Sequence, residues 1–511
     1  MHPKTDLQSL LDRPLRQHPD KLAIKTATER VSYGELDARV RSAAAGLRGQ
    51  GVAPGDRVAW LLPNCLEAVV TTLACYQLGA IAVPLNYRYV EQEVGDVLQR
   101  TRARLLVFHA TRREAVAPLL AADPELFAVQ VGGADRRSPS FDLLMNQQPT
   151  SEFAEVDPNH PALILFTSGS TGRPKGVVHS HVGAFCAIEV SREVFDFDAD
   201  DVVLVGKSIS HAGGLQTQLM PALMVGATVL LAKKPKPAEA ARWINEHAVT
   251  EYGMLASDLL DFVEWLEANP TPLPSLVNSI GSGDSVPEDL HHRFRDLLGW
   301  DVMEGAGMTE VGGYYAVNPR HGQRKWGSLG LPTPHTELRI VDEQGTPCLI
   351  GEMGEIVLRS PSTTTGYWED VDATADLSRG GWLHTGDLGR QDEDGYIWFV
   401  GRKKLMIVRR GSNIAPAEVE SVIDAHPLVH ASVVVALPDS RDGQVPVACV
   451  ALSEPQQRSM EPELRRFVAE HLAAYKNPTQ YLFLDELPRT GSGKFDRHRL
   501  QELAAQKLAP A

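Results

Sequence analysis

Near the N-terminus, apolar residues alternate between the spacing of a helix and the spacing of a buried strand. The stretch Ser32-Tyr-Gly-Glu35 predicts a capping box, in which the serine and glutamate side chains cap the first turn of a helix. Apolar residues then recur at helical spacing as far as Leu47, and Gly49 and Gly51 predict the end of that helix.

The same alternation continues downstream. Strand-like runs are predicted over residues 57–62, 80–85 and 105–108, and helix-like runs over residues 66–78 and 90–99. Because helices and strands take turns along the chain, the pattern favours parallel sheets that are covered by helices.

Two apolar stretches, residues 68–85 and 217–232, are long enough to be weighed as membrane spans. Each is interrupted by a glycine, Gly79 or Gly226, that separates a helix end from a buried strand. We therefore interpret them as buried helix–strand pairs and expect no membrane span. The likeness of the two units hints at two related sheet subdomains.

The pattern of apolar and polar residues changes in the last third of the chain. Residues 345–369 predict a small β unit, and a compact α+β pattern begins after Gly401-Arg-Lys-Lys404. Its helices are predicted over residues 416–425 and 463–474, and its strands over residues 431–437 and 446–452. The predicted fold class is α/β: a large N-terminal domain of layered α/β subdomains plus the small β unit (residues 1–401), and a small mobile α+β C-terminal domain (residues 402–511).

Composition narrows the function. Of 511 residues, 43% are hydrophobic and 23% are charged, as in ordinary soluble proteins. The net charge of -15 argues against a general nucleic-acid binder, which needs a basic surface. The five cysteines form no CxxC pair, and the N-terminus has no apolar signal core, so we expect a cytoplasmic protein.

The segment Thr167–Gly176, TSGSTGRPKG, follows a strand-like apolar run. Its glycines and hydroxyls allow several backbone N–H groups to approach a polyanion closely, and a nucleotide triphosphate is the natural one. A Walker A loop is excluded, because Pro174 precedes Lys175 and Gly176 follows it where that motif requires serine or threonine. The alternative is a surface turn rich in serine and glycine.

Further segments suit the same chemistry. In Gly305–Glu310 a glutamate beside a threonine ends a loop of small residues, which suits a hard cation such as Mg²⁺. Asp387, in Gly381–Asp387, can accept hydrogen bonds from the two hydroxyls of a ribose. The mobile loop Pro488–Lys494 ends in one lysine.

Taken in order along nearly the whole chain, these segments resemble the motifs of the acyl-adenylate-forming enzymes. That family includes acyl-CoA synthetases, 4-coumarate–CoA ligases, firefly luciferases and the adenylation domains of peptide synthetases. The resemblance implies an ATP-dependent acid–thiol ligase. It would activate a carboxylic acid as acyl-AMP with release of pyrophosphate, and then transfer the acyl group to coenzyme A.

The resemblance also assigns residues. Lys494, His211 and Glu310 would be catalytic, with Glu310 also holding Mg²⁺; Lys404 would be the hinge between the domains; and Arg409, Arg410 and Gly411 would meet CoA. The residues expected to bind ATP are Thr167, Ser168, Gly169, Ser170, Thr171, Gly172, Lys175, Gly283, Gly305, Ala306, Gly307, Met308, Thr309, Asp387, Arg402 and Lys494.

The need for Lys494 follows from electrostatics. An attacking carboxylate and an α-phosphate repel each other by on the order of a few kcal/mol at about 3–4 Å. A lysine that bridges both anions offsets this repulsion and stabilises the charge that develops in the transition state. Because a thiol needs its own path of approach, the resemblance implies that the C-terminal domain rotates about Lys404 between the two half-reactions.

The acid is the least defined feature. The segments 210–216, 281–285 and 305–313 contain no arginine or lysine, which favours a monocarboxylate. Ala306 and the nearby glycines Gly307, Gly312 and Gly313 suggest room for a bulky, medium-chain or aromatic acid, and Ala306 departs from the aromatic residue usual in the family.

Two other functions stay open: a freestanding adenylation enzyme that loads a carrier-protein phosphopantetheine, and a nucleotide-binding protein without activity on the same scaffold. A luciferase-type oxygenase shares the fold, but no residue here requires it. The expected partners are a small carboxylic acid, ATP and CoA, and a homodimer is left open.

Overall fold

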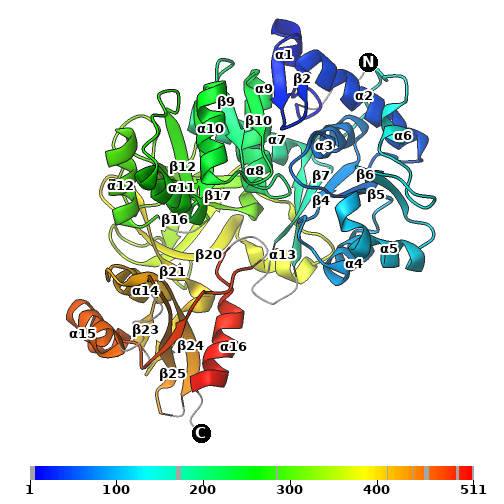
Figure 1. The fold of residues 1–511 in the computed structure, drawn as a ribbon. Helices are drawn as coiled ribbons and strands as arrows, with labels where there is room; N and C mark the ends of the chain where they lie inside the picture. The colour runs from blue at the N-terminus through cyan, green and yellow to red at the C-terminus, as the bar shows by residue number, and fades with distance from the viewer. Residues whose placement is uncertain are drawn as a thin grey trace. The chain divides into compact units, whose positions relative to one another are not determined.

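The computed structural model describes residues 6–167, 174–283, 286–410, 412–439, 441–453, 460–490 and 494–508. The chain forms two compact units, which are described separately below (Figure 1). The first unit comprises residues 1–337 and 358–383, and the second comprises residues 338–357 and 384–511. The predicted domain boundary at residue 402 therefore lies inside the second unit, and a boundary of motion there stays a prediction.

The first unit contains a seven-stranded sheet. Its order is β18 (Gly366–Tyr367), β8 (Lys175–Ser180), β7 (Pro161–Thr167), β4 (Ile81–Pro84), β3 (Arg57–Leu61), β5 (Leu105–His109) and β6 (Phe127–Val131). The strands from β7 to β6 are parallel, whereas β7 and β8 form an antiparallel hairpin.

A nine-stranded sheet forms the other half of this unit. Its order is β15 (Leu331–Pro332), β14 (Gly313–Val317), β13 (Met303–Met308), β12 (Asn278–Ser282), β11 (Glu251–Leu255), β9 (Val202–Val205), β10 (Thr228–Leu231), β1 (Leu22–Lys25) and β2 (Arg30–Ser32). Strands β9, β11, β12 and β13 are parallel neighbours, so their carboxyl ends meet at one edge, where α/β sheets bind ligands.

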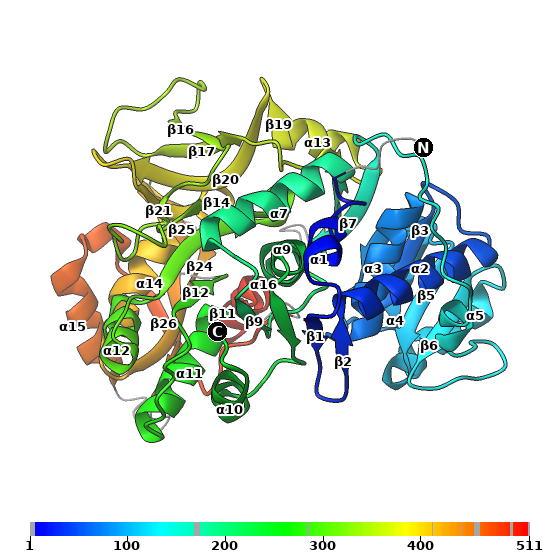
Figure 2. The same cartoon turned by 90° about the horizontal axis from the view of Figure 1, so that it is seen from above.

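Helices fill the space between the two sheets and cover both outer faces (Figure 2). The inner layer shares one core with both sheets and contains α2 (Tyr33–Gly49), α3 (Leu66–Leu78), α7 (His181–Phe195), α8 (Ala212–Gly214), the π-helix η2 (Leu215–Leu219) and α9 (Met220–Val225). The outer helices are α10 (Pro237–His247), α11 (Ala256–Ala268) and α12 (Glu288–Leu298) on the nine-stranded sheet, and α4 (Glu91–Thr101) and α5 (Arg113–Ala122) on the seven-stranded sheet. This arrangement is the predicted layered α/β architecture.

Local sequence signals explain the inner layer. Helix α2 starts with the predicted capping box between Ser32 and Glu35. All but one residue of α3 is buried, which explains why its sequence is apolar on all sides. The glycines Gly79 and Gly226 end α3 and α9 at positive φ and lead into strands of different sheets, as the two helix–glycine–strand units suggested.

Short elements complete the first unit: α1 (Asp12–Gln17), η1 (Ala110–Arg112), α6 (Asp142–Met145), η3 (Thr309–Val311) and α13 (Val371–Leu377). A five-stranded sheet, most of whose residues belong to the second unit, contains β16 (Glu337–Val341), β17 (Gly354–Arg359), β20 (Trp382–Gln391), β19 (Ser378–Arg379) and β21 (Ile397–Arg402). The predicted β unit over residues 345–369 is therefore divided, because β17 joins this sheet whereas β18 extends the seven-stranded one.

The C-terminal part of the second unit has the predicted α+β pattern. Its sheet has the order β23 (Ser412–Ile414), β22 (Ile407–Arg409), β25 (Gly443–Leu452) and β24 (Val429–Asp439), and β26 (Gln480–Leu484) pairs with β25. Helices α14 (Pro416–Asp424) and α15 (Glu461–His471) pack in one core, and α16 (Arg497–Leu508) packs in another. The short helices η4 (Lys403–Leu405) and η6 (Ala474–Lys476) lie in connections.

Two expectations from composition can be compared with the structure. The five cysteines are free thiols. No helix in the described part of the chain combines the length and the apolar character that crossing a bilayer demands.

Candidate functional site

The glycine- and hydroxyl-rich segment connects the two strands of the β7–β8 hairpin. Thr167 ends β7, Lys175 begins β8, and the two residues face each other across the ladder. The predicted phosphate-binding residues Ser168, Gly169, Ser170, Thr171 and Gly172 lie outside the described residues. The segment leads into a strand, whereas a Walker A loop would lead into a helix.

The Thr309–Glu310 turn is held in place by backbone hydrogen bonds. His179 of β8 donates from Nε2 to the carbonyl oxygen of Thr309 at 2.8 Å, and the N–H of Thr364 donates to the carbonyl oxygen of Glu310 at 2.7 Å. His179 is fully buried, and burial lowers its pKa to about 4, so the ring is neutral at physiological pH.

Tyr367 of β18 links two predicted site residues. Its hydroxyl donates to Glu310 Oε1 at 2.7 Å, and Lys175 Nζ lies 4.7 Å from the centroid of its ring. Burial, and then the charge of Glu310, raise the pKa of Tyr367, so the phenol remains a donor. The sequence analysis missed Tyr367 and His179. His179 follows two valines in β8, the strand that continues from the glycine-rich segment, and Tyr367 follows a run of three threonines and a glycine.

Glu310 can take part in binding a metal ion. One carboxylate oxygen receives the tyrosine hydrogen bond, and within the described ranges no group of three or more acidic, histidine or cysteine side chains is gathered for a metal. This fits Mg²⁺, which is commonly held by one or two carboxylates together with substrate phosphates and water.

Five of the residues predicted to bind ATP lie at the shared edge of the parallel strands. Gly283 follows β12 with φ +95°, and Gly305, Ala306, Gly307 and Met308 form the end of β13. A Cβ on Gly305 would lie 2.9 Å from the carbonyl oxygen of Ala316, and a Cβ on Gly307 would lie 2.5 Å from that of Gly313. These glycines are therefore required by close backbone packing.

The same reasoning corrects an inference about pocket size. A Cβ on Gly312 would lie 2.8 Å from Ala187 Cβ, and a Cβ on Gly313 would lie 3.1 Å from Thr217 Cγ2. Gly307, Gly312 and Gly313 thus allow the turn to pack closely and are not in themselves evidence for a roomy acyl pocket.

His211 stands at the start of α8, beside the same strand edge. Its Nε2 lies 3.4 Å from Asn86 Nδ2, and its side chain is half-buried. Further along this segment, Gln216 is 1% exposed and its amide has no hydrogen-bond partner among the described residues. Lys207, just before His211, is also buried and reaches Ser282 of β12.

In the second unit, the two predicted ribose-binding residues are neighbours. Asp387 of β20 faces Arg402 of β21 across the ladder, and Arg402 Nε lies 3.0 Å from Asp387 Oδ1. Asp387 is buried, whereas the Arg402 side chain is more than half exposed. The carboxylate of Asp387 can accept hydrogen bonds from hydroxyl groups, and the guanidinium of Arg402 fixes the orientation of that carboxylate.

The arginines predicted to meet CoA share one carboxylate that the sequence did not reveal. Asp442 Oδ2 lies 2.9 Å from Arg409 Nε, and its Oδ1 lies 2.6 Å from Arg410 Nε. Hydrogen bonds from Arg409 and then Arg410 lower the pKa of Asp442. Gly411 lies outside the described residues.

The predicted hinge and catalytic lysines lie in short connections. Lys404 is exposed in η4, where the preceding Lys403 contacts Glu355 at 3.2 Å. Lys494 is exposed, and its carbonyl oxygen accepts from the N–H of Thr490 at 2.7 Å, just before α16. This hydrogen bond ties the two ends of the predicted mobile loop together, while residues 491–493 lie outside the described residues.

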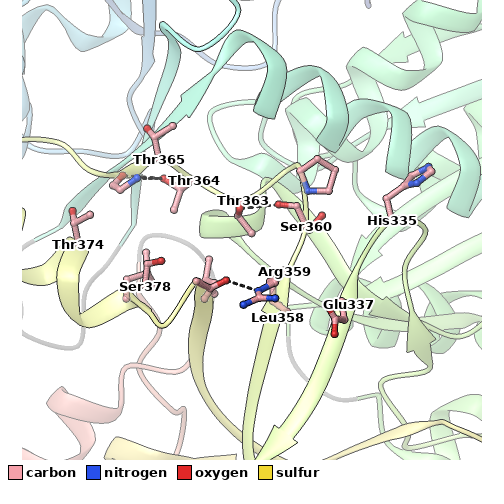
Figure 3. A pocket seen from close by; sticks show the side chains of 15 residues that line it. His335, Glu337, Leu358, Arg359, Ser360, Thr363, Thr364, Thr365, Thr374 and Ser378 are labelled. Atoms are coloured by element: carbon pink, nitrogen blue, oxygen red, sulfur yellow. Dashed lines mark hydrogen bonds between the residues drawn. The ribbon is translucent and has the colours of Figure 1, made fainter. Parts of the chain in front are cut away.

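A cavity of about 510 Å³ opens elsewhere in the first unit (Figure 3). Hydroxyl side chains line it, including those of Ser360, Thr363 and Thr364. None of the predicted site residues contributes to its lining. Two lining residues are hydrogen-bonded to the candidate site: Thr364 through its N–H, as described above, and Thr374, whose Oγ1 accepts from the N–H of Tyr367 at 2.9 Å.

Comparison with known proteins covers both units. A family model described as "AMP-binding enzyme" matches residues 11–368, and one described as "AMP-binding enzyme C-terminal domain" matches residues 418–494. The chain is 36% identical to a feruloyl-CoA synthase of an Amycolatopsis species over 491 residues, covering 94% of this chain and 96% of that protein.

It is 33% identical to an indoleacetate–CoA ligase of Aromatoleum aromaticum over 510 residues, covering 98% of this chain and 99% of that protein. Its structure matches the crystal structure of the anthranilate CoA ligase AuaEII in complex with anthranoyl-AMP. The TM-score is 0.92 at 27% identity, and the match covers 99% of this chain and 98% of that chain.

Proposed function

The chain belongs to the AMP-binding enzyme family, and from that premise we propose that it is an AMP-forming ligase that joins an aromatic monocarboxylic acid to coenzyme A. Family membership confirms the resemblance to the acyl-adenylate-forming enzymes and their chemistry, which uses ATP and CoA as substrates. The observation that carries the activity is the match to CoA ligases over almost the full length of both partners.

The choice of an aromatic acid rests on the relatives. The names of the feruloyl-CoA synthase, the indoleacetate–CoA ligase and the anthranilate CoA ligase all specify an acid with an aromatic ring. These three acids differ in the length and substitution of the group that links the carboxylate to the aromatic ring. This supports an aromatic substrate class for the present chain, without choosing among its members.

In the first half-reaction, the chain must hold MgATP and an acid close together. We assign the phosphates to Lys175 and the predicted loop before it. Glu310, oriented by Tyr367, would hold Mg²⁺, which when bound would neutralise phosphate charge. Asp387 and Arg402 are assigned to the ribose. Lys494 is assigned to the carboxylate and the α-phosphate, whose mutual repulsion a cation offsets.

In the second half-reaction, the thiol of CoA attacks the acyl-AMP carbonyl and AMP leaves. Arg409 and Arg410 are assigned to the CoA phosphates. One carboxylate, Asp442, already balances part of their charge, so the pair presents a net charge near +1. A rotation about Lys404, bringing Lys494 and the Arg409–Arg410 face to the substrate in turn, remains part of the proposal.

A panel of acids tests the function. The purified protein is mixed with MgATP, CoA and one acid at a time: benzoates, phenylacetates, cinnamates, indoleacetate and fatty acids of medium length. AMP and the thioester are then quantified. We expect AMP and an acyl-CoA in equal amounts with at least one aromatic acid.

Two other results would favour a different function. Pyrophosphate release that CoA does not convert into thioester would favour a carrier-protein loader. Binding of ATP without pyrophosphate release with any acid would favour a nucleotide-binding protein without this activity.

A further inference from the structure

Lys207 carries a buried ammonium group with little to bind it. The residue is 8% exposed, and Nζ donates one hydrogen bond, to Ser282 Oγ at 2.7 Å. No carboxylate in the described part of the chain forms an ion pair with it. The buried carboxyl of Glu251 interacts with the charge of Lys207, but burial raises the pKa of Glu251 to about 8, so this group is mostly uncharged at neutral pH. A lysine has three N–H donors, so two are left for other acceptors. A cation in such a place is costly unless a ligand or water completes its shell.

The position of Lys207 is fixed by the fold. It follows β9 at the carboxyl edge of the nine-stranded sheet and reaches past β11 to the last residue of β12. The buried side chain of Asn64 clamps the turn, because its amide donates to the carbonyl oxygens of Lys207 and Ala232 and accepts from the N–H of Ile209. The ammonium is therefore held on a rigid part of the scaffold.

Its neighbours belong to two of the segments whose lack of arginine and lysine favoured a monocarboxylate. His211 lies four residues further along the chain, and a Cβ on Gly213 would lie 3.9 Å from Lys207 Cδ. Ser282, its hydrogen-bond partner, belongs to the segment 281–285. The inference of a monocarboxylate counted arginine and lysine residues only inside these segments. Lys207 lies outside them in sequence, but the fold brings its side chain to them.

Given the proposed function, on which this inference rests, we propose that Lys207 is a specificity-determining residue. Its ammonium donates to an oxygen on the acid, remote from the reacting carboxylate: a ring hydroxyl, a ring methoxy group or a second carboxylate. An acid of the same skeleton without that oxygen leaves the buried ammonium without its partner. Sites built to hydrogen-bond a substrate group discriminate strongly against analogues that lack it.

The alternative role for Lys207 is structural, as a clamp between β9 and β12 through Ser282. The two roles predict different behaviour. A clamp affects all acids equally and lowers stability when removed. A specificity residue affects only acids with the remote oxygen. Removing its unpaired charge leaves the folded protein at least as stable.

The test compares acids in matched pairs. The wild type, Lys207→Met and the control Lys236→Met are assayed for kcat/KM by pyrophosphate release. The pairs are benzoate, phenylacetate and cinnamate, each against its 3-hydroxy, 4-hydroxy and 4-carboxy forms. Lys236 is an exposed lysine at the start of α10 and provides the same chemical change outside the site.

We expect the wild type to prefer an oxygenated acid by roughly 10- to 150-fold, the range for one hydrogen bond to a charged group. Lys207→Met should remove that preference while keeping kcat/KM for the unsubstituted acid within about threefold. Lys236→Met should behave as the wild type. A preference for the hydroxy or for the carboxy member identifies which oxygen is read.

Three results overturn the proposal, the third of which is given last. One is a wild type that turns over both members of every pair equally, a measurement that needs no variant to fold. Another is a Lys207→Met enzyme that loses the same factor on both members. Activity with fatty acids alone would also overturn it while leaving the ligase function intact, whereas absence of AMP formation with every acid would overturn the proposed function itself.

Discussion

The hydroxyl of Tyr367 offers the sharpest test of the Glu310 assignment. Tyr367→Phe removes one oxygen atom and keeps the ring, so the contact with Lys175 Nζ at 4.7 Å survives. What is lost is the 2.7 Å hydrogen bond to Glu310 Oε1. The carboxylate is then free to rotate away from the geometry that suits a bound cation.

The size of the effect follows from the type of bond. A hydrogen bond to a charged group contributes about 1.5–3 kcal/mol, which corresponds to roughly 10- to 150-fold in an equilibrium or rate constant. Glu310 is only half-buried, so water replaces part of the lost interaction. We therefore expect the lower end of the range, about a tenfold fall in kcat/KM for MgATP.

The assay is exchange of labelled pyrophosphate into ATP, measured as a function of Mg²⁺ concentration. The half-saturating Mg²⁺ concentration should rise in Tyr367→Phe, while the thermal unfolding temperature stays close to that of the wild type. Tyr33→Phe is the matched control. Its hydroxyl donates to the carbonyl oxygen of Ala227 at 2.6 Å in the core, so it should lose stability by about 1–3 kcal/mol and keep its Mg²⁺ dependence. An unchanged Mg²⁺ dependence in Tyr367→Phe would refute the assignment.

Three further outcomes are expected. Lys494→Ala should lose pyrophosphate exchange but keep thioester formation from supplied acyl-AMP; equal loss of both would contradict its role. Between pH 6.5 and about 4 the unfolded chain binds a proton at His179 that the native protein does not, so stability should fall by about 2 kcal/mol from pH 7 to pH 5. His179→Gln should flatten that dependence, and an unchanged slope in denaturant titrations would count against it. Gln216→Met should raise the unfolding temperature, because the buried amide lacks a partner among the described residues; a lower temperature would show that water satisfies it.

The layered fold could be predicted because its signals are local. The capping box at Ser32 and the glycines after α3 and α9 determine where helices start and stop, and these positions agree with the structure. The division at residues 345–369 could not be predicted, since nothing local in the sequence tells which sheet β17 or β18 joins. Only long-range pairing of Gly366–Tyr367 with β8 assigns β18 to the other sheet.

The candidate site could be predicted less completely than the fold, again because long-range contacts are not visible in the sequence. Motifs identify residues that lie in one loop, such as Thr309 and Glu310, but the side chains that orient them come from elsewhere in the chain. Tyr367 is 57 residues from Glu310, and Lys207 is 75 residues from Ser282. Both contacts exist because parallel strands bring their carboxyl ends to one edge, or because a late strand adds to an early sheet. If Lys207 reads the acid as proposed, a charge that the fold brings beside the acid changes the choice of substrate without changing any motif.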